Sequence, residues 1–213
     1  MDIEVDPALA PLGIKLWTGV LEGIKVGQSR KEVFRALSLE LKADLRERFP
    51  DAERIPNDPV VRSLRRLYWS IGIDPTKTRP ASEALLRRSL TKELPMINDL
   101  VDAGNIASAE TLVPIGLYDM DRVRGALRLR RAEASERFIG IGGKDDLLSE
   151  GVPVLSDEAG IIHIYPHRDS MRTRITEDCT KALIVACGAR GIDDGLLELA
   201  VERTIELFDQ LRR

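Results

Sequence analysis

The sequence is poor in the residues that build disulfide-linked, zinc-bound or membrane-spanning proteins. Its 213 residues include only two cysteines and two histidines, which excludes a disulfide scaffold and a Cys/His zinc module. We therefore expect neither a metal nor a cofactor. No apolar run approaches the ~20 residues that a membrane span needs. The acidic start, Met1 to Asp6, lacks the apolar stretch of a secretory signal, so we expect a cytoplasmic protein.

Aromatic residues are also scarce, at 4%, but hydrophobic residues make up 43% of the chain and are sufficient for a buried core. No internal repeat, low-complexity tract or Gly/Ser linker divides the sequence. We therefore expect a single domain over residues 1–213. Its first 60 residues carry few of the motifs described below.

The charge is low on average and uneven along the chain. The 32 basic and 35 acidic residues give a net charge of −3, which by itself argues against a general polyanion binder. Residues 62–92 nevertheless carry an excess of six positive charges, and residues 122–131 hold five arginines and no acid. A solvated face explains any one such stretch, but several of them between acidic chain ends favour a polyanionic partner.

The first half of the chain is predicted to be mostly helical after an extended segment at residues 14–26. Ser29 followed by Glu32 has the spacing of a capping box, and the apolar stripe behind it predicts a helix ending before Pro50. The apolar spacing predicts three further helices, at residues 59–71, 80–90 and 97–107.

The second half changes to short β-branched or alternating runs, separated by Asp, Gly and Pro, which predict strands. These runs cover residues 111–118, 126–131, 138–141, 152–155 and 161–165. Residues 180–186 fit a strand or a helix end, and residues 193–211 predict a final helix. The fold class is therefore α+β: a layered domain with a mixed or antiparallel sheet and segregated helices.

The helix at residues 97–107 carries one candidate site. Asn98, Asp102 and Asn105 are spaced i, i+4 and i+7, so we expect them to project from one helix face. A solvated polar face explains this pattern. The alternative is that the amide and carboxylate groups face a cleft, where they would hold a small polar ligand.

A second candidate site follows the predicted strand at residues 161–165. After Pro166 come a histidine, an arginine, an aspartate and hydroxyl groups: His167, Arg168, Asp169, Ser170 and Thr173. Strand ends joined to loops often present reactive groups, and here the histidine would act as a base while the arginine would hold an anion. Turn capping by Asp169 and Ser170 explains part of the same pattern.

Other patterns indicate structure rather than chemistry. The Gly140–Lys144 stretch lacks the spacing of a phosphate-binding loop and predicts a turn. Cys179 and Cys187 lie in an apolar stretch, so we expect both to be small buried residues. His163 is expected to pack against Tyr165.

From residue 87 to about residue 180 the sequence resembles the B3/B4 domain of the bacterial phenylalanyl-tRNA synthetase β subunit, in its free-standing form. The best-matching core, residues 79–180, includes the motifs Arg79–Arg88, Ile97–Asn105, Pro114–Asp119, Gly125–Arg130 and Tyr165–Ser170 with Thr173. The resemblance implies a B3/B4-like layered fold. It also implies an editing activity, in which the ester bond of mischarged tRNA is hydrolysed after binding alone has failed to reject the wrong amino acid.

Under this resemblance Asn105 falls on a pocket asparagine of the family. Gly116 stands where the synthetase domain has a histidine, and Pro95 stands where it has an arginine, so the synthetase's specificity for mischarged tyrosine does not carry over.

The preferred hypothesis is a trans-editing aminoacyl-tRNA deacylase, with aminoacylated tRNA as partner and a synthetase as a possible second partner. The predicted catalytic residues are His167, Arg168 and Asp169. The predicted substrate-binding residues are Asn98, Asp102, Asn105, Ser170 and Thr173, with Asp102 facing the substrate ammonium. The predicted tRNA-binding residues are Arg79, Arg87, Arg88, Arg128 and Arg130.

Two alternatives stay open: a non-catalytic tRNA-binding or synthetase-associated module, and a binder or hydrolase of a free amino-acid derivative. The enzyme hypothesis requires Asn105, Asp102 and His167 to line one cavity, and it fails if they point to separate surfaces.

Overall fold

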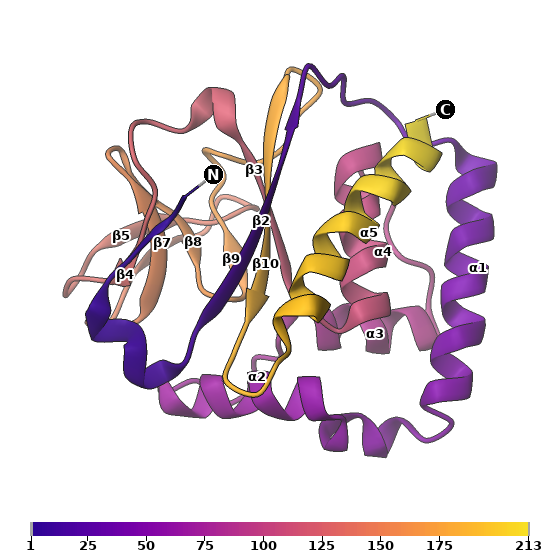
Figure 1. Cartoon of the computed structure of the whole chain (residues 1–213), viewed down its shortest axis with the longest axis horizontal. Helices are drawn as coiled ribbons and strands as arrows, with labels where there is room; N and C mark the ends of the chain where they lie inside the picture. The colour runs from indigo at the N-terminus through magenta and orange to yellow at the C-terminus, as the bar shows by residue number, and fades with distance from the viewer. Residues whose placement is uncertain (1, 213) are drawn as a thin grey trace.

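The computed structural model describes residues 2–212. In Figure 1 most strands lie on the left and most helices on the right, while α2 (Pro59–Ser70) runs beneath the strands. One sheet has five strands in the order β1-β4-β7-β8-β9, a second has three in the order β2-β10-β3, and β5 and β6 form a hairpin. The strands are β1 (Glu4–Val5), β2 (Lys15–Glu22), β3 (Ile115–Asp119), β4 (Arg128–Arg131), β5 (Arg137–Ile139), β6 (Asp145–Leu147), β7 (Pro153–Asp157), β8 (Gly160–Ile164), β9 (Arg168–Asp169) and β10 (Lys181–Gly188).

Every strand pair is antiparallel except β1 with β4, which is parallel. This arrangement confirms the predicted fold class. The strands that the sequence did not predict, β1, β6 and β9, have only two or three residues each. Such short strands lack the periodicity on which a prediction depends.

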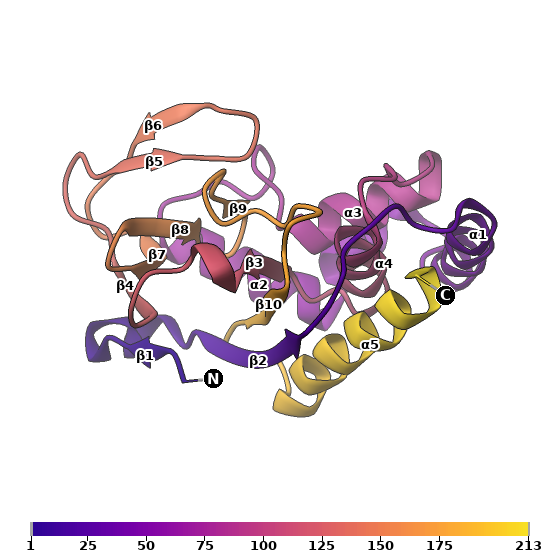
Figure 2. The same cartoon turned by 90° about the horizontal axis from the view of Figure 1, so that it is seen from above.

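The helices are α1 (Lys31–Arg48), α2 (Pro59–Ser70), α3 (Ala81–Thr91), α4 (Asp99–Thr111) and α5 (Asp194–Arg212), with short 3₁₀ segments at Pro7–Leu12, Ala52–Asn57 and Met120–Arg122. In both views α1 lies at the outer edge of the helical side, and α5 lies beside the three-stranded sheet (Figures 1 and 2). Gly19 of β2 allows this close approach, because a Cβ there would lie 2.5 Å from a methyl of Val201 on α5.

All five predicted helices are present, but the predicted capping box is wrong. Helix α1 begins at Lys31, one residue later than expected, and Arg30 occupies its cap position without a side-chain hydrogen bond. The Ser29 hydroxyl instead donates to Oδ2 of Asp102, at 2.6 Å. A long-range partner has replaced the local cap that the spacing favoured.

Strand β10 is buried along almost its entire length and contributes to both of the larger hydrophobic cores. One core lies among the helices and includes Leu41, Leu100 and Phe208. The other lies between the two sheets and includes Leu129 and Ile162. The segment predicted as a strand or a helix end is therefore the central strand of the three-stranded sheet.

No helix within residues 2–212 is long and apolar enough to cross a membrane.

Candidate functional site

A pocket of about 240 Å³ lies where α4, the edge strand β3 and the segment after β8 meet. Six of its lining residues are aliphatic: Ile97, Val101, Ile115, Leu117, Ile141 and Ile175. Three are polar: Asn105 from α4, Asp169 from β9, and Arg174 from the loop that leads to β10. Two of the sequence-predicted site residues, Asn105 and Asp169, are thus brought together.

Glycine at position 104 sets the distance between α4 and β3. A Cβ at Gly104 would lie 2.8 Å from a methyl of Leu117, so only glycine lets this turn of α4 contact the strand. The close contact places the neighbouring Asn105 beside β3, where its half-buried side chain borders the pocket.

Asp169 is held by the buried His163 and lies near the buried Tyr118. Its Oδ1 lies 2.9 Å from Nδ1 of His163, the residue paired with it across β8 and β9. The buried Tyr118 hydroxyl lies near the same carboxylate and has no hydrogen-bond partner within the described chain. Burial, followed by the charge of Asp169, raises the pKa of Tyr118 well above its usual value. His163 also packs edge-on against Tyr165, as predicted.

The hairpin β5–β6 closes one side of the pocket through Ile141. The Ile141 amide donates to the Asp169 carbonyl at 2.9 Å, and the Met171 amide donates to the Ile139 carbonyl at 3.0 Å. Arg168 fastens the same hairpin, because its guanidinium donates to Asp146 at 2.5 Å and lies over the Phe138 ring. Arg168 is thus engaged in holding the pocket wall and does not line the pocket.

The other two predicted substrate-binding residues at this helix, Asn98 and Asp102, lie outside the pocket. Asn98 precedes the helix and caps it, accepting from the Val101 amide at 2.9 Å. Asp102 is fully buried, and its two oxygens accept from the Ser29 hydroxyl and from the Ile97 amide at 2.8 Å. Burial raises the pKa of Asp102, because no cation lies beside it to offset the loss of hydration. Asp102 is therefore unavailable to a substrate ammonium in this structure.

His167 also lies apart from the pocket. Its ring packs against that of Tyr68, with 5.7 Å between the ring centroids, and burial lowers the pKa of His167 to about 4. The imidazole is accordingly neutral at pH 7. Asn105, Asp102 and His167 do not line one cavity, so the enzyme hypothesis does not hold with those three residues.

Ser170 and Thr173 have structural contacts. The Ser170 hydroxyl accepts from the Arg172 amide at 3.1 Å, and the Thr173 carbonyl accepts from the Asp119 amide at 2.9 Å. The second contact joins the end of β3 to the loop that carries Arg174.

Three arginines, one on α2, one on α3 and one between these helices, surround one carboxylate. Glu83 is fully buried and pairs with Arg65 at 2.7 Å, Arg87 at 2.8 Å and Arg79 at 3.8 Å. Burial alone would raise the pKa of Glu83, but the guanidiniums of Arg65 and Arg87 outweigh it and hold that pKa below its ordinary value. The next residue, Arg88, donates to the Glu93 carbonyl.

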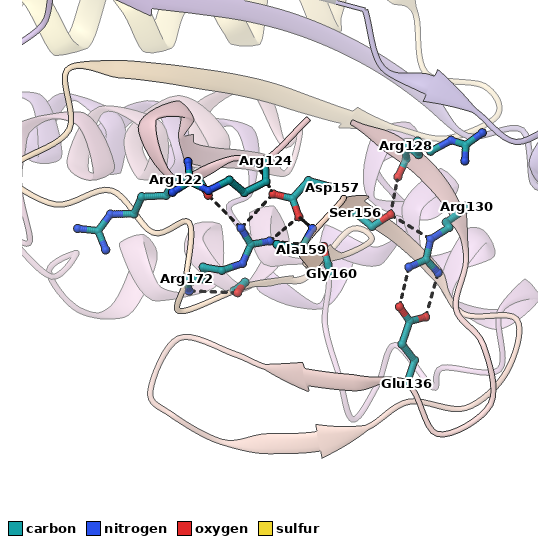
Figure 3. A network of polar contacts seen from close by, with 11 residues as sticks. Arg122, Arg124, Arg128, Arg130, Glu136, Ser156, Asp157, Ala159, Gly160 and Arg172 are labelled. Atoms are coloured by element: carbon teal, nitrogen blue, oxygen red, sulfur yellow. Dashed lines mark hydrogen bonds and ion pairs between the residues drawn. The ribbon is translucent and has the colours of Figure 1, made fainter. Parts of the chain in front are cut away.

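Arginines on and beside the five-stranded sheet also have acidic partners within the chain (Figure 3). Arg130 forms a bidentate pair with Glu136, and Arg172 forms one with the buried Asp157. Arg128 pairs with Glu4, both side chains being more than half exposed. Most of the arginines predicted to bind tRNA therefore already have a partner within the chain.

Within residues 2–212 no group of three or more His, Cys, Asp or Glu side chains could hold a metal ion. Cys179 and Cys187 are free thiols and are buried, as predicted.

A family model, the B3/4 domain, matches residues 63–213, and the chain belongs to this family. It is 32% identical over 98 residues to the phenylalanine–tRNA ligase β subunit of Mycoplasma genitalium, and 23% identical over 160 residues to that of Tropheryma whipplei. Those alignments cover 45% and 71% of this chain but only 12% and 17% of the ligase subunits.

The fold is similar to that of an N-terminal fragment of the phenylalanyl-tRNA synthetase β subunit from Pyrococcus horikoshii. The TM-score is 0.51 at 14% identity, over 99% of this chain and 48% of that one. The resemblance stated from the sequence motifs is thereby confirmed for the family and for the fold.

Gly116, where the resemblance places a synthetase histidine, leaves no room for a side chain. A Cβ at this position would overlap the Tyr118 hydroxyl. The side chain of Tyr118, two residues further along β3, occupies that space.

Three pocket residues were not predicted from the sequence: Arg174, Ile97 and Ile141. None belongs to a polar motif, and they come from three separate segments that only the tertiary fold brings together. Arg174 was visible in the sequence as one charge among several, without a signal that distinguished it.

Proposed function

We propose that the pocket binds the aminoacyl end of a charged tRNA and that the protein hydrolyses its ester bond, as a trans-editing deacylase. The observation that carries this proposal is that Asp169 and Asn105 line one pocket together with six aliphatic residues. At about 240 Å³ the pocket is smaller than the ~300–1,000 Å³ typical of drug-sized ligands and suits an amino acid.

In this proposal Asp169 binds the α-ammonium of the substrate. Because its Oδ1 is held by His163, the carboxylate is fixed in orientation before the ligand arrives. An aminoacyl ester keeps the positive α-ammonium, but its carboxyl group is esterified and carries no charge. The single negative charge of Asp169 therefore complements the charge of the substrate. The aliphatic residues of α4 and β3 would contact the amino-acid side chain.

Water attacks the ester carbonyl without a covalent enzyme intermediate, and the free ribose hydroxyl of the substrate assists. The Asn105 amide and the Arg174 guanidinium are the donors available to the developing oxyanion. Donors of this kind contribute about 3 kcal/mol to the stabilisation of such a transition state. Arg174 can also contact the terminal phosphate, since its side chain is exposed.

The test is incubation of the protein with a panel of tRNAs, each charged with a matched or mismatched amino acid. We expect deacylation of at least one mismatched pair. Asp169→Asn should lower kcat/KM about 100-fold by removing the ammonium partner, and Asn105→Ala should do so by a similar factor. His167→Gln is the control and should retain the activity, because His167 does not line the pocket. If no charged tRNA in the panel is deacylated, the proposal is rejected.

A second candidate function is a non-catalytic tRNA-binding or synthetase-associated module. The observation in its favour is that the pocket lining contains no histidine and that Asp102 and His167 lie outside it. Under this candidate tRNA would bind with the salt dependence of phosphate contacts while the ester remained intact.

A third candidate is a binder or hydrolase of a free amino-acid derivative. It is favoured by the presence of both a carboxylate and a guanidinium in the pocket. Asp169 and Arg174 would pair with the ammonium and the carboxylate of one free amino acid. Calorimetric titration with free amino acids distinguishes this candidate from the deacylase. The third candidate predicts binding of a free amino acid, whereas the deacylase proposal predicts only weak binding.

A further inference from the structure

Helix α1 separates its charges onto two faces. Lys31, Arg35, Lys42 and Arg46 fall within one narrow stripe of the helix, by the 100° rotation per residue. Glu40, Asp44 and Glu47 fall on the opposite side, together with Arg48, which pairs with Asp44 at 3.2 Å.

The basic stripe borders a cleft between α1 and α3, with a volume of about 150 Å³. Arg35 and Lys42 line it from α1, and Lys92 lines it from the end of α3. The one acid in the lining is Glu93. None of these three basic side chains forms an ion pair with a carboxylate of residues 2–212, in contrast to the arginines around Glu83.

The floor of this cleft combines apolar surface with an unused hydroxyl. Phe34 and Leu94 are each 5% exposed, whereas Leu39 at the rim is 69% exposed. Ser38 Oγ lies on the same side of α1 as Arg35 and Lys42, is shielded from solvent, and has no hydrogen-bond partner among the described residues. Three cationic side chains and this hydroxyl beside an apolar floor can bind an anionic group whose neighbouring atoms are partly apolar.

We propose that the cleft and the basic stripe of α1 form a phosphate-binding surface for the backbone of an RNA strand. This inference rests on the tRNA partner of the proposed function and assigns that partner to α1 and Lys92 rather than to the arginines that are paired with Glu83. Arg35 and Lys42 are seven residues apart, about 10.5 Å along the helix axis. That length spans about three nucleotides of a helical strand.

The position of the cleft relative to the pocket supports an RNA strand as occupant. The segment between α3 and α4 contributes Lys92 and Leu94 to the cleft and Ile97 to the pocket. Three residues of chain span at most about 11 Å. A strand bound along α1 can thus continue over this segment and place its 3′ end at the pocket.

The experiment compares two double variants of the full chain for binding of uncharged tRNA, measured by fluorescence anisotropy over a range of salt concentrations. Arg35→Gln with Lys42→Gln removes two cations from the cleft. Arg54→Gln with Lys77→Gln removes two exposed cations elsewhere and is the matched control. Thermal unfolding of both variants confirms that they are folded.

We expect the cleft variant to bind tRNA roughly tenfold more weakly at low salt and to reduce the slope of log Kd against log salt by about 2. The control should match the wild type. Equal affinity for the cleft variant and the wild type, or no tRNA binding by the wild type, overturns the proposal. Because uncharged tRNA is used, loss of deacylation with intact, cleft-dependent binding would reject the editing function and leave the phosphate surface standing.

Discussion

The arginines of the middle of the chain and the basic residues of α1 carry the same charge in different surroundings. Around α3, Arg65, Arg79 and Arg87 converge on one buried carboxylate, Glu83. On α1, Arg35 and Lys42 have no such partner within the described chain. A charge that already has a fixed counterion inside the protein gains less from a phosphate, because the existing pair must first be broken. Local charge density therefore does not identify a binding surface unless the pairing is known.

The sharpest test of this comparison removes the shared carboxylate. Glu83→Ala should lower the free energy of unfolding by about 3 kcal/mol, because it leaves three guanidiniums without their buried counterion. Chemical denaturation measures the loss. Arg79→Gln is the matched control and should cost less than about 1 kcal/mol, because Arg79 lies 3.8 Å from the carboxylate with 46% of its side chain exposed. Equal small losses for both variants would show that the cluster does not stabilise the fold.

A smaller effect is expected from acid. The pKa values of Glu83 and Asp157 are held below their ordinary values, because their arginine partners, with backbone amides at Asp157, outweigh the effect of burial. Each therefore binds protons more weakly in the folded chain than in the unfolded chain. The stability that they contribute is present above about pH 4 and is lost as the pH falls through their folded-state pKa values.

The melting temperature, followed from pH 6 to pH 3, checks this expectation. Arg172→Gln removes the partner of Asp157 and should make the profile shallower. Arg35→Gln, on α1, should leave its shape unchanged. An identical change in both variants would contradict the distinction between paired and unpaired cations.

The smallest expected effect concerns another buried acid, Asp102, which has no ion-pair partner among residues 2–212. Burial raises its pKa, so its ionised form costs stability at neutral pH, and this cost is relieved as the pH falls through the raised pKa. Asp102→Asn should therefore change the free energy of unfolding at pH 7 by less than about 1 kcal/mol, in the stabilising direction. Deacylation of tRNA should be unchanged.

Denaturation at pH 7 and at pH 4 measures the Asp102 effect, with the gain expected only at the higher pH. Loss of deacylation in Asp102→Asn without loss of stability would restore the sequence-based role of Asp102 as the ammonium partner.

The helices were predictable because their signals are local. The apolar stripe behind Ser29, Pro59 at the start of α2 and the break before Pro50 all act within one or two helical turns. The capping box at Ser29 failed because the folded chain places the Asp102 carboxylate within 2.6 Å of the Ser29 hydroxyl, which donates to it instead of accepting from the Glu32 amide. Strand β9 could not be predicted, since its two residues exist as a strand only through pairing with β8.

The candidate site was predictable in part for the same reason. Asn105 and Asp169 were both singled out by residue type and motif, and the fold places them in one pocket. Asn98 and Asp102 share the helical spacing with Asn105, but Asn98 precedes the helix and Asp102 turns toward Ser29. Periodicity gives a direction around the helix axis to within a broad sector. It does not say which neighbouring segment occupies that sector.

The sequence by itself determined the α+β class, the five helices, the B3/4 family and the absence of clustered cysteine and histidine. Only the tertiary structure decided which polar groups are available to a ligand. It joined Asp169 and Arg174 to Asn105, buried Asp102 and filled the space over Gly116 with Tyr118. It also paired three arginines with Glu83, while Arg35 and Lys42 of α1 have no ion-pair partner among residues 2–212. The physical reason is that availability depends on burial and on the nearest opposite charge, and both are set by residues that lie far apart along the chain.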